Sequence, residues 1–130
     1  MRIAGTWNPK EVTPEREEAA QKAIIAAYEA GYTLFDHADI YCRGECEAIH
    51  GRVIKRIPAM RKEILIATKC GIRFPGEPNP DSPHRFDFSK EHILEACDAS
   101  FATVREPRPR RTVGDEQRHT HGPSEDLYGA

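Results

Sequence analysis

Apolar residues recur at helical spacing near the start of the chain. Within residues 14–30 they stand at Ala20, Ala23, Ile24 and Ala27. Thr13 precedes this segment as an N-cap, and Pro14 occupies its first turn. Gly31 follows the segment where a C-cap glycine is expected. The pattern predicts a helix over residues 14–30.

Two short apolar runs, each ending on a charged residue, alternate with helical segments. YTLFD (32–36) and EILIATK (63–69) are too short for helices and predict buried strands. Between them a helix is predicted over residues 45–57, with one apolar side made of Cys46, Ile49, Val53 and Ile57. This order predicts a parallel sheet with crossover helices, and residues 1–4 are expected to be the stub of an earlier strand.

Residues 70–88 contain four prolines and two glycines, which predict a long loop without a helix or strand. Ser89 is expected to cap a third helix, whose apolar side is predicted from Leu94, Cys97 and Phe101. Residues 105–130 hold five arginines, three prolines and only four apolar residues, a composition that predicts disorder. The chain is therefore expected to divide into a folded part, 1–103, and a tail, 104–130.

Length and charge restrict the classes of function. The 130 residues suit one domain, and a net charge of -2 gives no general attraction to nucleic acid or to an anionic membrane. The sequence has no apolar run of membrane-spanning length and no signal-peptide pattern, so we expect a cytoplasmic protein. The four cysteines are accordingly expected as free thiols.

The charged strand ends are candidates for chemistry. In a parallel sheet Asp36 and Lys69 emerge at the same edge, where an ion pair lowers the cost of burying both charges. Tyr41 follows in the next loop, and a neighbouring ammonium stabilises a phenolate, which helps a tyrosine to protonate a carbonyl oxygen as hydride arrives. The alternative from spacing alone is an ordinary ion pair beside a tyrosine that packs in a loop.

Three segments carry a resemblance to a known family. GYTLFDHADIY (31–41), CEAIHGRVI (46–54) and ILIATKCG (64–71) resemble the aldo-keto reductase family in order and spacing. The resemblance covers about residues 1–100 and implies an α/β fold, a partial (β/α)8 TIM barrel of about three βα units. It also implies reduction of small aldehydes or ketones with NADPH.

Residue by residue, the resemblance assigns roles to three positions. Asp36 matches the aspartate that holds the lysine, Tyr41 the proton donor, and Lys69 the residue that activates the tyrosine. Trp7 follows the expected first strand, near the mouth where a substrate would lie in such a barrel, and is a candidate substrate-binding residue; the alternative is a capping or packing aromatic.

The resemblance stops after about residue 100. No fourth strand ending in the family's catalytic histidine follows, the cofactor-binding residues are unidentified, and a full barrel needs about 250 residues. We hypothesise a truncated or frameshifted reductase, an incomplete and inactive fragment. The alternative is a non-catalytic fragment that acts at most as a protein-interaction module, with self-association through its open sheet edge.

Two other readings of the residues are weaker. Cys42, Cys46 and His50, with His37 nearby, raise the question of zinc, but structural zinc sites use closer cysteine pairs and no metal is predicted. REPRPRR (105–111) carries four arginines, yet the acids of the tail balance its basic residues, so a solvated tail is favoured over nucleic-acid binding.

Overall fold

The computed structural model describes residues 1–104, and the predictions made for the tail lie outside these residues. The elements run in the order η1 (Pro9–Glu11), α1 (Pro14–Glu29), β1 (Leu34–Asp36), η2 (Tyr41–Gly44), α2 (Glu45–Arg56), α3 (Met60–Glu63), β2 (Leu65–Ala67), β3 (Ile72–Arg73), β4 (Arg85–Phe86) and α4 (Lys90–Val104), where η marks 3₁₀ turns. The three long helices and the two longer strands confirm the predicted segments to within a few residues.

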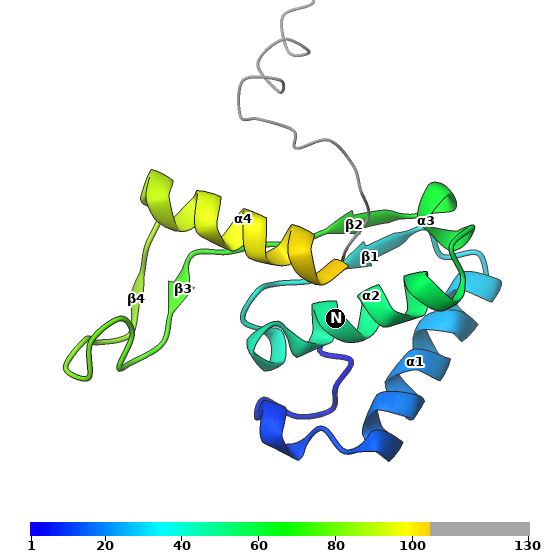
Figure 1. The fold of residues 1–130 in the computed structure, drawn as a ribbon, viewed down its shortest axis with the longest axis horizontal. Coiled ribbons are helices and arrows are strands. Elements are labelled where there is room, and N and C mark those ends of the chain that lie inside the picture. Colours follow the sequence, from blue (N-terminus) through cyan, green and yellow to red (C-terminus); the bar gives the residue numbers. More distant parts are fainter. Residues whose placement is uncertain (105–130) are drawn as a thin grey trace, which may run out of the picture.

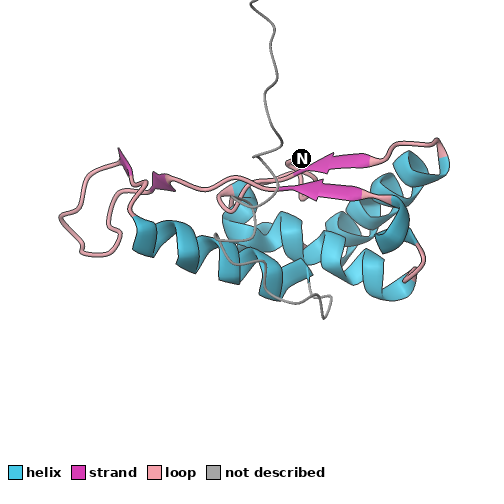
Figure 2. Cartoon of the chain, turned by 90° about the horizontal axis from the view of Figure 1, so that it is seen from above, coloured by secondary structure: helices cyan, strands magenta, loops and turns pink. Residues whose placement is uncertain are grey.

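Strands β1 and β2 form the predicted parallel pair. Leu34 stands opposite Leu65 and Asp36 opposite Ala67, so both strands present the same alternation of side chains. Figure 2 shows both arrows pointing toward the β3–β4 hairpin, which lies beyond the carboxyl ends of the strands. The α/β prediction with a short parallel sheet is therefore confirmed.

The expected strand stub at residues 1–4 does not form within the described chain. These residues lie in a turn, and the Met1 amino group donates a hydrogen bond to the Asp36 carbonyl at the end of β1. This one hydrogen bond places the N-terminus beside the sheet but does not form a ladder of strand hydrogen bonds. The parallel sheet of residues 1–104 consequently has two strands rather than three.

The helices cover only one face of this sheet, as Figures 1 and 2 show. Phe35 points toward the helices and is 2% exposed, whereas its neighbour Leu34 is 60% exposed and Leu65 is 70% exposed. Because side chains alternate across a strand, one face of each strand is buried and the other remains uncovered. An exposed apolar face of this kind is suited to contact with another surface.

Helix α2 forms the centre of the core and lies between α1 and α4 (Figure 1). Cys46, Ile49 and Val53 on its predicted apolar side are fully buried. Gly51 touches α4 so closely that a β-carbon there would lie 2.3 Å from the backbone oxygen of Thr103. A glycine inside a helix, which is unfavourable by propensity, is thus required for the approach of two helices.

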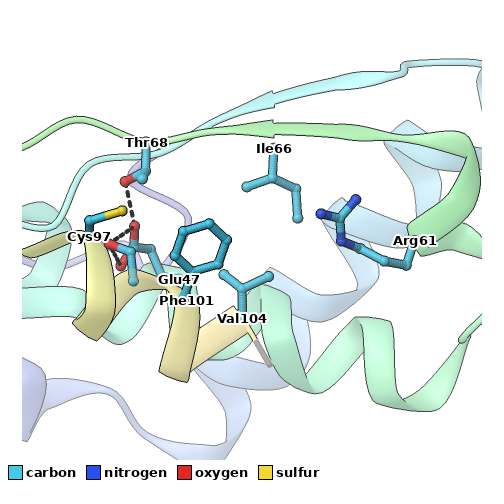
Figure 3. Close-up of a pocket in the computed structure, with 8 residues that line it drawn as sticks. Glu47, Arg61, Ile66, Thr68, Cys97, Phe101 and Val104 are labelled. Atoms are coloured by element: carbon cyan, nitrogen blue, oxygen red, sulfur yellow. Dashed lines mark hydrogen bonds between the residues drawn. The ribbon is translucent and has the colours of Figure 1, made fainter. Parts of the chain in front are cut away.

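The predicted apolar side of α4 is wrong as a buried face. Phe101 is 52% exposed, and the face turned toward α2 contains Ala96 and Ser100. Ser100 Oγ donates to both carboxylate oxygens of Glu47, at 3.0 and 3.1 Å, and Thr68 donates to the same carboxylate (Figure 3). Glu47 is 2% exposed, and a buried carboxylate needs hydrogen-bond donors, which Ser100 can supply and Phe101 cannot.

Phe101 instead borders a cavity of ≈110 Å³ between α4 and β2, together with Ile66 and Val104 (Figure 3). Glu47 lies at the polar end of this cavity. The cavity is on the helix side of the sheet and is lined by residues of α4 together with Ile66 and Thr68.

The long loop predicted over residues 70–88 is interrupted by secondary structure. Strands β3 and β4 pair antiparallel, with Ile72 opposite Phe86 and Arg73 opposite Arg85. The prolines fall between the two strands, in the connection, and therefore do not remove a ladder hydrogen bond. Two-residue strands give too short a period to recognise in the sequence.

Two further expectations concern the whole described part. Its four cysteines are free thiols. None of its helices has the length and apolar character needed to cross a membrane.

Candidate active site

Asp36 and Lys69 meet at the carboxyl edge of the sheet, because Asp36 ends β1 and Lys69 lies two residues past the end of β2. Lys69 Nζ donates to Asp36 Oδ2 at 2.6 Å and to the backbone carbonyl of His37 at 2.6 Å. The hydrogen bond from Lys69 holds the pKa of the Asp36 carboxyl below its usual range. Two acceptors therefore fix the position of one ammonium group.

The ring of Tyr41 lies beside this ammonium. Tyr41 is the first residue of the η2 turn that follows β1, and the Lys69 ammonium lies over the tyrosine ring, 5.4 Å from its centroid. Trp7 packs edge-on against Tyr41 with a centroid separation of 6.3 Å. The structure thus brings together all four residues singled out from the sequence, and their chemical roles stay predictions.

The turn that carries Tyr41 has an unusual backbone. Cys42 and Arg43 adopt positive φ angles of 49° and 51°, and Gly44 follows with 87°. Non-glycine residues seldom occupy this region, and such strain tends to occur at functional sites. Arg43 also bonds Glu77 at 2.6 Å, which ties the hairpin connection to the turn.

A buried pair of histidines lies next to the site. His37 Nε2 and His50 Nδ1 are 2.8 Å apart, and both side chains are fully buried. Burial lowers the pKa of His37 to about 3 and that of His50 to about 4, so both rings are neutral at pH 7. Because the carbonyl of His37 accepts a bond from Lys69, this pair links helix α2 to the ammonium.

Two aromatic residues that border the site were not predicted from the sequence. A cavity of ≈280 Å³ contains Tyr41 and Lys69 and is bounded by Phe86 and Phe88 of the hairpin region. The alternating run RFDF (85–88) is a weak strand signal that the surrounding prolines obscured. Its position beside Lys69 is set by tertiary structure alone.

The phosphate groups of a nicotinamide cofactor would need cationic side chains or backbone N–H groups as partners. Two arginines near this edge are engaged with acids, Arg43 with Glu77 at 2.6 Å and Arg73 with Asp87 at 3.2 Å. No metal cluster is formed within residues 1–104, since they contain no group of three or more His, Cys, Asp or Glu side chains arranged to hold an ion.

Comparison with curated proteins identifies the relatives. The chain is 38% identical over 76 residues to an uncharacterized oxidoreductase of Bacillus subtilis (strain 168), covering 58% of this chain and 25% of that protein. It is 34% identical over 96 residues to versiconal hemiacetal acetate reductase of Aspergillus parasiticus, covering 65% and 28%. It is 33% identical over 100 residues to 6-dehydroglucose reductase of Agrobacterium fabrum (strain C58 / ATCC 33970), covering 76% and 34%. The chain thus spans between a quarter and about a third of these relatives.

Solved structures agree with this relationship. An aldo-keto reductase from Bacillus halodurans in its holo form matches with a TM-score of 0.56 and 31% identity, over 68% of this chain and 28% of that one. A glycerol dehydrogenase from Gluconobacter oxydans matches with a TM-score of 0.62 and 26% identity, over 79% and 29%. These neighbours are barrel proteins, so the described fold is part of a TIM barrel. The model of the aldo/keto reductase family matches residues 3–106, and the chain therefore belongs to that family.

Proposed function

We propose that Asp36, Lys69 and Tyr41 form the proton-transfer part of a site that reduces aldehydes or ketones. The observation that carries this proposal is the Lys69 ammonium, held by Asp36 at 2.6 Å and placed over the Tyr41 ring. Relatives of the chain are reductases by name, which supports carbonyl reduction as the reaction class.

The contacts suggest a division of labour among the three residues. Tyr41 donates its phenolic proton to the carbonyl oxygen of the substrate, and the Lys69 charge stabilises the negative charge that develops on the phenolate. Asp36 and the His37 carbonyl hold Lys69 in place and do not exchange protons with the substrate. Trp7, packed edge-on against Tyr41, is proposed to border the bound substrate.

NADPH is proposed as the hydride source because of the family relationship. When bound, a nicotinamide supplies hydride to the carbonyl carbon. Because Arg43 and Arg73 are already paired with acids and the matched part is about a quarter to a third of each relative, we infer that these 130 residues alone reduce carbonyl compounds very slowly or not at all. Cytoplasmic localisation stays a prediction from the sequence.

A second candidate function is a non-catalytic interaction module. Leu34 and Leu65 expose a continuous apolar face, and the two-stranded sheet leaves strand edges for pairing with a second copy of the chain. Sedimentation velocity on the purified chain separates monomer from self-associated forms.

The proton-transfer proposal is best tested in a complete barrel. Residues 1–104 would replace the matching part of the Gluconobacter oxydans glycerol dehydrogenase, and carbonyl reduction would be followed by cofactor oxidation. Tyr41→Phe should lower kcat by about 10²- to 10⁴-fold, the usual contribution of general acid catalysis. Tyr32→Phe is the matched control, because Tyr32 is 65% exposed and precedes β1. An active chimera that keeps its rate after Tyr41→Phe would contradict the proposal.

A further inference from the structure

Two phenylalanine rings stand beside the proposed reacting groups. Phe86 belongs to β4 and Phe88 follows it, and both border the ≈280 Å³ cavity that contains Tyr41 and Lys69. Each of these side chains is 66% exposed. Burying apolar surface away from water is favourable, so two exposed rings at a cavity form a surface suited to an apolar ligand.

Phe88 is fixed by contact with the backbone that carries Lys69. A β-carbon on Gly71 would lie 2.3 Å from the Phe88 ring, so the ring rests directly on the glycine. Asp87 N also donates to the Gly71 carbonyl at 2.8 Å, and the Asp87 carboxylate accepts from Ser89 N at 3.0 Å. Close packing therefore holds the Phe88 ring on Gly71, which lies two residues after Lys69 in the chain.

Phe86 and Phe88 act as one surface. Their ring planes differ by only 8°, with centroids 6.2 Å apart, and His84 packs edge-on against Phe86 with a centroid separation of 5.9 Å. Aromatic rings favour offset-stacked or edge-to-face contact with another ring, which adds about 0.5–1.5 kcal/mol beyond the area buried. A planar aromatic substituent would make this contact, and a polyhydroxylated chain would not.

The charges around the cavity disfavour an anionic substituent. The Lys69 ammonium is already bonded to Asp36 and to the His37 carbonyl. Asp39 adds a carboxyl group to the lining of the cavity. A neutral substrate therefore avoids repulsion from Asp39 and leaves the contacts of Lys69 intact.

We propose that Phe86 and Phe88 determine specificity at this site and select neutral aryl aldehydes and aryl ketones over small polyhydroxylated carbonyl compounds. The proposal rests on the proposed function, since it assumes that the carbonyl group lies at Tyr41. It adds a substrate class and the two residues that recognise it.

Binding to the 130-residue chain tests the proposal without turnover. Acetophenone and dihydroxyacetone, both neutral ketones, would be titrated separately while the amide resonances of Gly71 and Ile72 are followed by NMR. A ring contact of the usual strength predicts that acetophenone binds about two- to tenfold more tightly and that Phe88→Leu removes this advantage. Leucine keeps an apolar group against Gly71, so the hairpin is expected to fold.

Phe101→Leu is the matched control, because Phe101 is similarly exposed, at 52%, but borders the other cavity on the helix side of the sheet (Figure 3). It should leave acetophenone binding unchanged. Equal binding of the two ketones, no binding of acetophenone, or an equal effect of the Phe88 and Phe101 substitutions would each overturn the proposal.

Acetophenone labelled with ¹³C at its carbonyl separates this inference from the proposed function. A hydrogen bond from Tyr41 would shift the carbonyl resonance on binding, and Tyr41→Phe would remove that shift. Ring-dependent binding without a Tyr41-dependent shift would support the role of Phe86 and Phe88 and contradict the placement of the carbonyl. A Tyr41-dependent shift with no preference between the ketones would do the reverse.

Discussion

Acidification should destabilise the chain through its buried histidine pair well before most carboxylates titrate. His37 and His50 share one hydrogen bond, and within the described residues the other ring nitrogen of each, His37 Nδ1 and His50 Nε2, has no hydrogen-bond partner. The pKa values, about 3 for His37 and about 4 for His50, are lowered chiefly by burial, with added repulsion between the pair at His37 and from Arg61 at His50. Folding therefore requires both rings to be neutral.

The sign and size of the effect follow from linkage. Each pKa is lower in the folded chain than the ordinary value of 6.5, so the unfolded chain binds more protons as pH falls. The contribution to stability is complete above about pH 6.5 and is lost as pH falls toward 4. At about 1.4 kcal/mol per pH unit for each ring, the pair should lower the free energy of unfolding by on the order of 4 kcal/mol between pH 7 and pH 5. Small domains have only about 5–15 kcal/mol of stability, so this loss is large.

Urea denaturation followed by circular dichroism, repeated at half-unit steps from pH 7 to pH 5, measures the free energy of unfolding. His50→Gln removes one titrating ring while keeping a side chain able to bond His37, and the pH dependence should fall to about half. A free energy of unfolding that stays constant across this window, or an unchanged slope in His50→Gln, would refute the reasoning.

Two further predictions concern the packing of α2. Gly51→Ala should gain about 1 kcal/mol of stability from helix propensity, but the 2.3 Å approach to the Thr103 carbonyl oxygen predicts a net loss of about 1–3 kcal/mol. The free energy of unfolding is measured by urea denaturation, and a stabilised variant would show that α4 does not pack there. Glu47→Ala should cost about 2–4 kcal/mol by the same assay, because it removes charge-assisted hydrogen bonds from Thr68 and Ser100. Ser100→Ala should cost less, and the opposite order would contradict the assignment of Glu47 as the shared acceptor.

Local signals in the sequence predicted the main elements well. Thr13 accepts a hydrogen bond from Arg16 N at 3.3 Å, as an N-cap should, and α1 starts at Pro14. The apolar side predicted for α2 is confirmed at Cys46, Ile49 and Val53, which are all buried in the core. These features depend on residues within one or two helical turns, and the pattern therefore contains the necessary information.

The buried face of α4 and the hairpin could not be predicted in the same way. Apolar spacing favoured Phe101 as a core residue, but the carboxylate of Glu47, far away in the chain, required Ser100 to face inward. Strands β3 and β4 have two residues each, too few for a period to be visible. In both cases a partner distant in sequence decided the outcome.

The sequence by itself determined that the first strand ends on Asp36 and that Lys69 closely follows the second, and parallel topology then required the two residues to share one edge. Only the tertiary structure decided that Lys69 lies over the Tyr41 ring, that Trp7 packs edge-on against Tyr41, and that Phe88 rests on Gly71. The physical reason is that strand order follows from local pattern and chirality, whereas contacts between side chains depend on how loops of different strands pack. Burial of the His37–His50 pair likewise requires α2 to cover the sheet, which no local pattern specifies.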